Sequence, residues 1–232
     1  MGYDIYLFDA DDTLFDYDKA EESALIETFK QNDLNYSKQV RVQYRCINSG
    51  LWALFERQEI DKSELQTQRF LRLFQEIEAE CDVKSFSENY LIELGKGSHL
   101  INGAYDICKA LHEQGKKIYI VTNGMSVSQK MRIENSEINH FISDLFVSED
   151  VGFQKPHKQY FDHVFLHVGK IDKRKVLIVG DSLTSDIQGG LNAGIDTCWF
   201  NPAKKENSIG VTPTYEITEL SEVLNLCKAV FI

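Results

Sequence analysis

The sequence has little proline, little glycine and no long apolar stretch. Among its 232 residues, 3 are proline and 14 are glycine, which is too few for a collagen-like or a long disordered chain. Its apolar runs are far too short to span a bilayer. The first residues do not form the basic and then apolar segment of a signal peptide. We therefore expect a globular, cytoplasmic protein without a membrane partner.

Positive charge is also scarce. The chain has 25 lysines and arginines against 36 aspartates and glutamates, for a formal net charge of −11. Binding of a nucleic-acid polymer requires a basic surface, so that partner is not expected. A small anionic substrate is still compatible, because a metal ion and one lysine can reverse the local field. The length suits one large or two small domains, and both a monomer and a homodimer remain open.

The cysteine pattern gives no sign of a disulfide framework. The number of cysteines is odd, none are spaced as C-x-x-C, and most have apolar neighbours. They are Cys46, Cys81, Cys108, Cys198 and Cys227. We expect all five to be reduced thiols packed in the interior of a cytoplasmic protein.

What the sequence does contain is a series of short, continuous apolar runs, each typical of a strand that is buried on both faces of a parallel sheet. These runs are 5–8, 118–121, 145–147, 176–179 and 198–200. Helical patterns lie between them at 104–111, 126–134, 157–168 and 183–193. This alternation predicts an α/β fold, a Rossmann-like parallel sheet with helices on both faces.

Residues 17–96 interrupt the alternation. They contain no convincing strand but several amphipathic helices, one with an apolar stripe over residues 70–77. Asp61 or Ser63 can cap the start of that helix. The segment therefore predicts an all-helical cap domain inserted into the sheet domain. The predicted core domain comprises residues 1–16 and 97–232.

Four of the predicted strands are followed by chemically active side chains. Asp9 and Asp11 follow the first strand, Thr122 and Asn123 the second, Lys155 the third, and Asp181 and Asp186 the fourth. In an open parallel sheet, ligands bind at the carboxyl ends of the strands. We therefore expect these seven side chains to converge at one edge of the sheet.

Several carboxylates in one site repel each other unless a positive charge is present. Oxygen ligands suit Mg²⁺, a hard cation that also bridges to phosphate. Lys155 would add a second positive charge, and Thr122 and the backbone N–H groups near Asn123 could hold phosphate oxygens. This combination indicates phosphoryl transfer by positioning and electrostatics.

The four segments resemble the signature of the haloacid dehalogenase (HAD) superfamily of phosphohydrolases, and the likeness covers the whole chain. Asp9-x-Asp11-x-Thr13 is similar to its first motif, Thr122 to its second, Lys155 to its third, and Gly180-Asp181 with Asp186 to its fourth. The helical insertion lies where the members with a C1-type helical cap carry it.

The resemblance implies a role for each position. Asp9 would attack phosphorus to form an aspartyl-phosphate, and Asp11 would donate and then accept a proton. Thr122, Asn123 and Lys155 would bind the phosphate, and Lys155 would also stabilise the nucleophile. The metal would be held by the side chains of Asp9 and Asp181 and the backbone carbonyl of Asp11. Asp186 would support the metal through water or orient Lys155.

Within the superfamily, the segments 8–15, 121–124 and 148–156 are most similar to pyrimidine-type 5′-nucleotidases. This likeness implies a small phosphorylated metabolite as partner, specifically a nucleoside 5′-monophosphate. A sugar phosphomutase, or a phosphatase for another small phosphorylated metabolite, is the alternative. A dehalogenase would leave Asp11 unexplained, because its reaction needs no proton donor for an alcohol. Trp52 and Phe55 have the helical spacing of packing residues rather than of a nucleobase platform.

Overall fold

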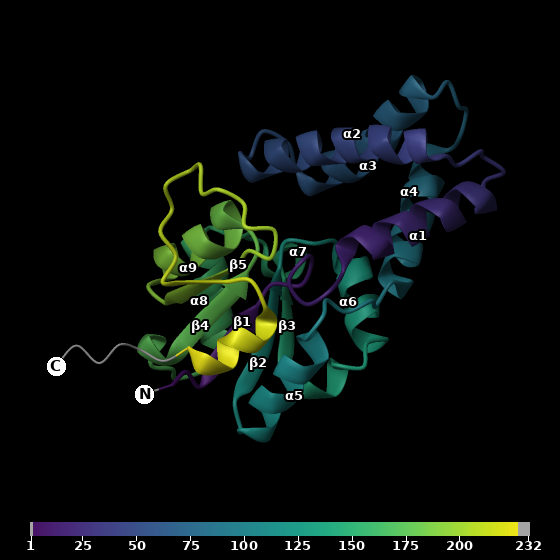
Figure 1. Cartoon of the computed structure of the whole chain (residues 1–232). Coiled ribbons are helices and arrows are strands. Elements are labelled where there is room, and N and C mark those ends of the chain that lie inside the picture. The colour runs from purple at the N-terminus through teal and green to yellow at the C-terminus, as the bar shows by residue number, and fades with distance from the viewer. Residues whose placement is uncertain (1, 227–232) are drawn as a thin grey trace. The chain divides into compact units, whose positions relative to one another are not determined.

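A computed structural model describes residues 2–226 of the chain (Figure 1). It divides into two compact units, Met1–Tyr17 with Ser98–Ile232 and Asp18–Gly97. The boundaries expected from the sequence, after residues 16 and 96, lie within one residue of these. Within residues 2–226, none of the helices is both long and apolar enough to cross a membrane.

The first unit is built on a six-stranded parallel sheet with the order β3-β2-β1-β4-β5-β6, which confirms the predicted fold class. The strands are β1 (Ile5–Phe8), β2 (Lys117–Thr122), β3 (Asp144–Val147), β4 (Val176–Gly180), β5 (Asp196–Phe200) and β6 (Tyr215–Ile217). The central strand β1 pairs with β2 on one side and β4 on the other, and Phe8 lies opposite Ile120 and Val179. The strands β3, β2, β1 and β4 are neighbours in this order, so their carboxyl ends lie side by side.

Helices cover both faces of this sheet (Figure 1). They are α5 (Ala104–Glu113), α6 (Ser126–Glu134), α7 (Ser148–Val151), α8 (Lys158–Val168) and α9 (Gln188–Ala193), with the short turns η1 (Asn139–Phe141), η2 (Lys173–Lys175), η3 (Leu183–Ile187) and η4 (Leu220–Asn225). Tyr6 and Phe8 pack in one core with α5 and η4, whereas Leu7 packs in a second core with α8 and α9. Alternate residues of β1 are thus buried on opposite faces, which explains its unbroken apolar run.

The second unit contains four helices within the described residues. They are α1 (Tyr17–Gln31), α2 (Lys38–Glu56), α3 (Lys62–Glu76) and α4 (Val83–Lys96). Phe70 on α3 is fully buried among aromatic rings of α2, α3 and α4, with ring centroids 4.9–6.3 Å away. Trp52 and Phe55 pack edge to face at 5.5 Å, and Phe55 is buried. The apolar stripes of these helices therefore face one aromatic core.

The cysteines depart in part from the expectation of packed thiols. Cys108 and Cys198 are buried, but Cys46 is exposed and Cys81 is partly exposed, so the expectation is wrong for these two. Cys46 lies on α2 outside the stripe of buried residues that runs through Val40, Tyr44, Asn48, Leu51 and Phe55. Cys227 lies outside the described residues.

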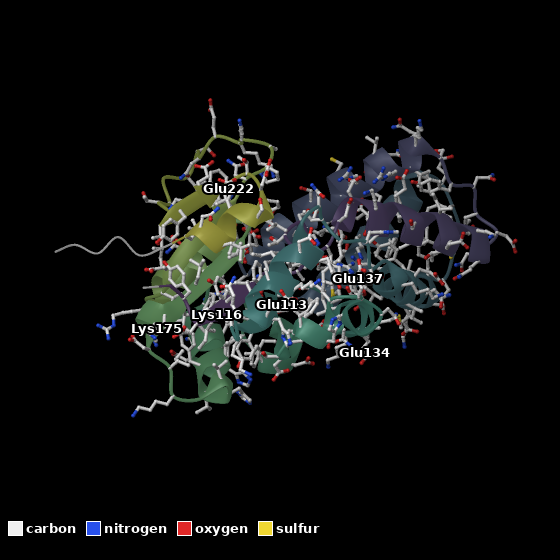
Figure 2. All side chains as sticks on the ribbon, turned by 60° about the horizontal axis from the view of Figure 1, so that its bottom comes forward. Glu113, Lys116, Glu134, Glu137, Lys175 and Glu222 are labelled. Atoms are coloured by element: carbon white, nitrogen blue, oxygen red, sulfur yellow. The ribbon has the colours of Figure 1, made fainter. Side chains whose placement is uncertain are left out.

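Ion pairs join the segments at the amino ends of the central strands. Asp4 precedes β1 and pairs with Lys116, at 3.0 Å, and with Lys175, at 2.7 Å. Figure 2 labels both lysines, which directly precede β2 and β4. These groups are exposed or half-buried, so each pair contributes little to stability. At this edge of the sheet, the carboxylate of Asp4 is balanced by two lysines.

Candidate active site

The structure brings four of the predicted side chains together at the carboxyl ends of the strands. Asp9 directly follows β1, Asp181 directly follows β4, and Lys155 and Asp186 come from the segments after β3 and β4. Lys155 contacts both Asp9 and Asp186. One carboxylate oxygen from each of Asp9, Asp181 and Asp186 lies within 4.8 Å of the others. The neighbouring positions of β1 and β4 in the sheet explain why distant parts of the chain meet here.

Lys155 is the centre of this cluster. Its side chain is 1% exposed, and Nζ donates to Oδ1 of Asp9 at 2.5 Å, to Oδ1 of Asp186 at 2.6 Å and to the carbonyl oxygen of Val121 at 2.8 Å. An ammonium group has three N–H donors, so all of them are used. Burial alone would lower the pKa of Lys155, but the carboxylates of Asp186 and Asp9 outweigh it and raise that pKa. Lys155 is therefore held as a permanent cation.

Asn123 fixes the backbone of Lys155. Its amide nitrogen donates to the Lys155 carbonyl at 2.9 Å, and its amide oxygen accepts from the Lys155 N–H, also at 2.9 Å. Thr122 is buried, and its hydroxyl oxygen accepts from the Gly124 N–H at 2.9 Å. The structure thus places Asn123 as a support for Lys155. Phosphate binding by Thr122 and Asn123 remains a prediction.

Asp186 is fully buried beneath the site. Its Oδ1 accepts from Lys155, and its Oδ2 accepts from the Ser182 N–H at 3.1 Å. Asp186 lies in η3, a π-helical turn that begins the helix predicted over 183–193, and α9 continues it. A Cβ atom on Gly180 would overlap the Asp186 carboxyl group. Glycine at position 180 thus makes room for the carboxylate that accepts a hydrogen bond from Lys155.

The electrostatics of the cluster favour a cation. Burial, with smaller contributions from Asp186 and Asp12, raises the pKa of Asp181 to about 7. Burial also raises the pKa of Asp9 well above its ordinary value, although Lys155 opposes this. Three carboxylates therefore face one ammonium group, and a divalent cation would keep them ionised. Their closely spaced oxygen atoms are the donors that Mg²⁺ prefers, so the residues present fit that ion.

The structure places the Asp11 side chain outside this cluster. Its carboxylate is paired with the guanidinium of Arg132, and its Oδ2 accepts from Nε2 of Gln129 at 2.6 Å. Both partners lie on α6 and are buried, and sequence reasoning did not identify either of them. The pattern that could have pointed to them is the presence of polar residues on the buried face of α6, at Ser128, Gln129 and Arg132.

Comparisons with known proteins give a consistent result. A family model described as haloacid dehalogenase-like hydrolase matches residues 6–200. The HAD-hydrolase YfnB of Bacillus subtilis is 42% identical over 97% of this chain and 95% of its own length. Its magnesium-bound crystal structure, described as revealing interdomain movement, has a TM-score of 0.91 and covers 97% of this chain and 98% of that chain.

Two further relatives are named pyrimidine 5′-nucleotidases. PynA of Streptococcus pneumoniae is 36% identical over 97% of this chain and 95% of its own length. YjjG of Escherichia coli is 33% identical over 98% of this chain and 100% of its own length. The chain is thus similar to these proteins over nearly its full length.

Proposed function

The chain belongs to the haloacid dehalogenase-like hydrolase family, and from this membership we propose that it is a magnesium-dependent phosphomonoesterase that uses Asp9 as its nucleophile. One observation carries the proposal. The buried ammonium of Lys155 joins Asp9 to Asp186, and Asp181 lies beside both carboxylates. Such a site has a fixed nucleophile, a fixed positive charge and oxygen ligands for a hard cation.

The contacts of Asp9 suit nucleophilic attack. Lys155 holds Oδ1, which leaves Oδ2 to attack the phosphorus atom of a bound ester. In the proposed first step, Oδ2 forms a bond to phosphorus, the ester oxygen leaves, and Asp11 gives that oxygen a proton. In the second step, water attacks the aspartyl-phosphate, Asp11 accepts the proton from the water, and free phosphate and Asp9 are regenerated.

Asp9 and Asp181 would hold the Mg²⁺ ion through their side chains, and Asp11 through its backbone carbonyl. When bound, the ion would supply positive charge that compensates the phosphate oxygens. Asp186 has one oxygen on Lys155 and the other on the Ser182 N–H, so orienting Lys155 is the role that its contacts support. Thr122 retains its hydroxyl proton as a donor for a phosphate oxygen.

We propose nucleoside 5′-monophosphates as the substrate class. Support comes from the relatives PynA and YjjG, which are named pyrimidine 5′-nucleotidases and match this chain over nearly its full length. The helical unit, Asp18–Gly97, is proposed to be the cap domain of the family. Its sequence would then determine which leaving group is accepted.

The test is phosphate release from nucleoside monophosphates, sugar phosphates and p-nitrophenyl phosphate, with and without Mg²⁺. We expect Asp9→Asn to lower kcat by at least about 10³-fold, because it removes the attacking oxygen. The matched control is Asp162→Asn, which changes an exposed carboxylate on α8 and should have no effect. Wild-type turnover by Asp9→Asn would contradict the mechanism. An isomerised sugar phosphate with little free phosphate would identify a mutase instead.

A further inference from the structure

Two side chains of α6 hold both oxygens of the Asp11 carboxylate. The guanidinium of Arg132 contacts Oδ1, and Nε2 of Gln129 donates to Oδ2 at 2.6 Å. Arg132 and Gln129 are three positions apart, so they lie on the same face of the helix. The carboxylate is thereby fixed in its plane as well as in its position.

The burial of Arg132 shows that this arrangement has a cost. Arg132 is 0% exposed, and its ion-pair partner within residues 2–226 is Asp11. Its Nε and Nη2 atoms are buried and have no hydrogen-bond partner among the described residues. The ring of Phe15 lies 5.6 Å from the guanidinium carbon and gives a further favourable contact. A buried charge with unused donors is unfavourable for stability, so packing does not explain an arginine at this position.

The Asp11 carboxyl group keeps unused lone pairs and partial exposure to solvent while it is held. A carboxylate offers about four lone-pair sites, and the two observed contacts use one on each oxygen. The Asp11 side chain is 27% exposed, in contrast to both of its partners. Its backbone is also fixed, because residues 11 and 15 form a bridge and the Asp12 N–H donates to the Phe15 carbonyl at 2.8 Å.

Gly124 makes the Gln129 contact possible. A Cβ atom at position 124 would overlap the side chain of Gln129. This glycine follows Thr122 and Asn123, so the segment after β2 supports Lys155 through Asn123 and makes room for Gln129 through Gly124. One short segment therefore influences both the nucleophile side and the Asp11 side of the site.

We propose that Arg132 and Gln129 are positioning residues for Asp11, which fix the direction in which its carboxylate gives and takes the proton. The inference rests on the proposed function, since it gives Asp11 that role. It extends the function by assigning a task to two side chains outside the cluster around Lys155. It also explains why charged and amide side chains replace apolar ones on the buried face of α6.

The test separates the first chemical step from the second. With p-nitrophenyl phosphate, the leaving group needs no proton, so formation of the aspartyl-phosphate should survive in Gln129→Met and Arg132→Lys. Release of phosphate requires Asp11 as base and should slow. We therefore expect a burst of nitrophenol equal to the enzyme concentration, then a kcat about tenfold to a hundredfold below wild type. KM should fall in parallel, so that kcat/KM, which reports only the first step, stays within about twofold of wild type.

The control is Lys130→Met, which removes an exposed lysine on the same helix that pairs with Asp150 at 2.9 Å, and it should behave as wild type. Arg132→Lys keeps the charge but loses the guanidinium fork, so Arg132→Met should be more severe. If the arginine variants do not fold, Gln129→Met and Gly124→Ala provide the same test. Unchanged kcat in Gln129→Met, or loss of the burst together with turnover, would overturn the inference.

Parallel assays of Asp9→Asn and Asp11→Asn distinguish failure of the positioning role from failure of the proposed function. If Asp9→Asn retains turnover, the phosphatase mechanism itself is wrong. If Asp9→Asn and Asp11→Asn are both inactive while Gln129→Met and Arg132→Lys match wild type, the mechanism stands and only the positioning role is wrong.

Discussion

At the scale of single residues, the contacts of Lys155 define how it can act. All three of its N–H donors are used within the protein, by Asp9, Asp186 and the Val121 carbonyl. The side chain therefore has no unused donor for a phosphate oxygen and would influence a bound phosphate through its charge. Its placement is controlled by two neighbours, Asn123 on its backbone and Asp186 on its ammonium group.

Gly180→Ala should impair the site by displacing Asp186. The new Cβ atom would overlap the carboxyl group of Asp186, which is fully buried and has little room to move. We expect Lys155 to lose its alignment and kcat/KM for phosphate release to fall by about 10²-fold. Overpacking should also lower the free energy of unfolding by about 1–3 kcal/mol. Enzyme kinetics and thermal unfolding measure both effects.

Gly50→Ala is the matched control for that substitution. Gly50 lies inside α2, and a Cβ atom there would meet no other atom within 4 Å. Alanine is favoured over glycine in a helix interior by about 1 kcal/mol, so this variant should be slightly more stable and equally active on p-nitrophenyl phosphate. A Gly180→Ala enzyme as active as Gly50→Ala would contradict the role given to Asp186.

At the scale of elements, the start of α3 decides between two residues that the sequence left open as caps. The Asp61 side chain accepts from the Glu64 N–H at 2.8 Å, and the Glu64 side chain accepts from the Asp61 N–H at 3.0 Å. Asp61→Ala should therefore lower stability by about 1 kcal/mol. Ser63→Ala, an exposed change two positions later, should have almost no effect. Equal melting temperatures for the two variants would contradict the assignment of Asp61 as the cap.

The strands that a sequence reveals are those buried on both faces. The run 5–8 coincides with β1, and the runs at 118–121 and 176–179 each fall inside an observed strand, because residues on both faces of the central strands must be apolar. β6 escaped prediction because it has three residues, lies at the edge of the sheet and exposes Glu216. The strand β6 is defined mainly by its pairing with β5, so its own residues give little sequence signal for a strand.

Whether a site residue could be predicted also depends on whether its sequence signal is local or long-range. Asp9, Lys155, Asp181 and Asp186 could be predicted because each follows a recognisable strand and the sheet brings strand ends together. Arg132 and Gln129 could not, because helical periodicity shows only that they share a face. Their partner, Asp11, is more than a hundred positions away and is brought to them by the fold. Polar side chains that pair across a long stretch of sequence follow no periodic pattern, so periodicity cannot predict the pair.

At the scale of the whole molecule, the sheet carries different charge balances at its two edges. At the amino ends, Asp4 is paired with Lys116 and Lys175, the two lysines labelled in Figure 2. At the carboxyl ends, Lys155 pairs with Asp9 and Asp186, and the third carboxylate of the cluster, Asp181, lies beside them. The acidic excess at the second edge has a measurable consequence for stability, because burial and mutual repulsion raise the pKa values of Asp9 and Asp181.

The direction of this consequence follows from proton linkage. The pKa of Asp181 rises from its ordinary value of 3.8 to about 7 in the folded protein, so the folded state holds a proton that the unfolded state has lost. In this pH range the free energy of unfolding decreases as the pH rises. The stabilising contribution is complete below about pH 4 and is lost as the pH passes about 7. A cation bound to the ionised oxygens would restore stability where the loss is greatest.

Addition of Mg²⁺ should therefore raise the melting temperature more at about pH 7.5 than at about pH 5, since at the lower pH protons compete for the same carboxylates. Asp181→Asn should remove most of this increment and flatten the pH dependence of the metal-free protein, because an amide has no proton to lose at this pH. Asp162→Asn, which alters an exposed carboxylate on α8, should leave the Mg²⁺-induced increase in melting temperature and the pH dependence of the metal-free protein unchanged. Melting curves with Mg²⁺ or with a chelator test this directly. Equal Mg²⁺ increments at the two pH values, or an unaltered increment in Asp181→Asn, would show that the ion binds elsewhere.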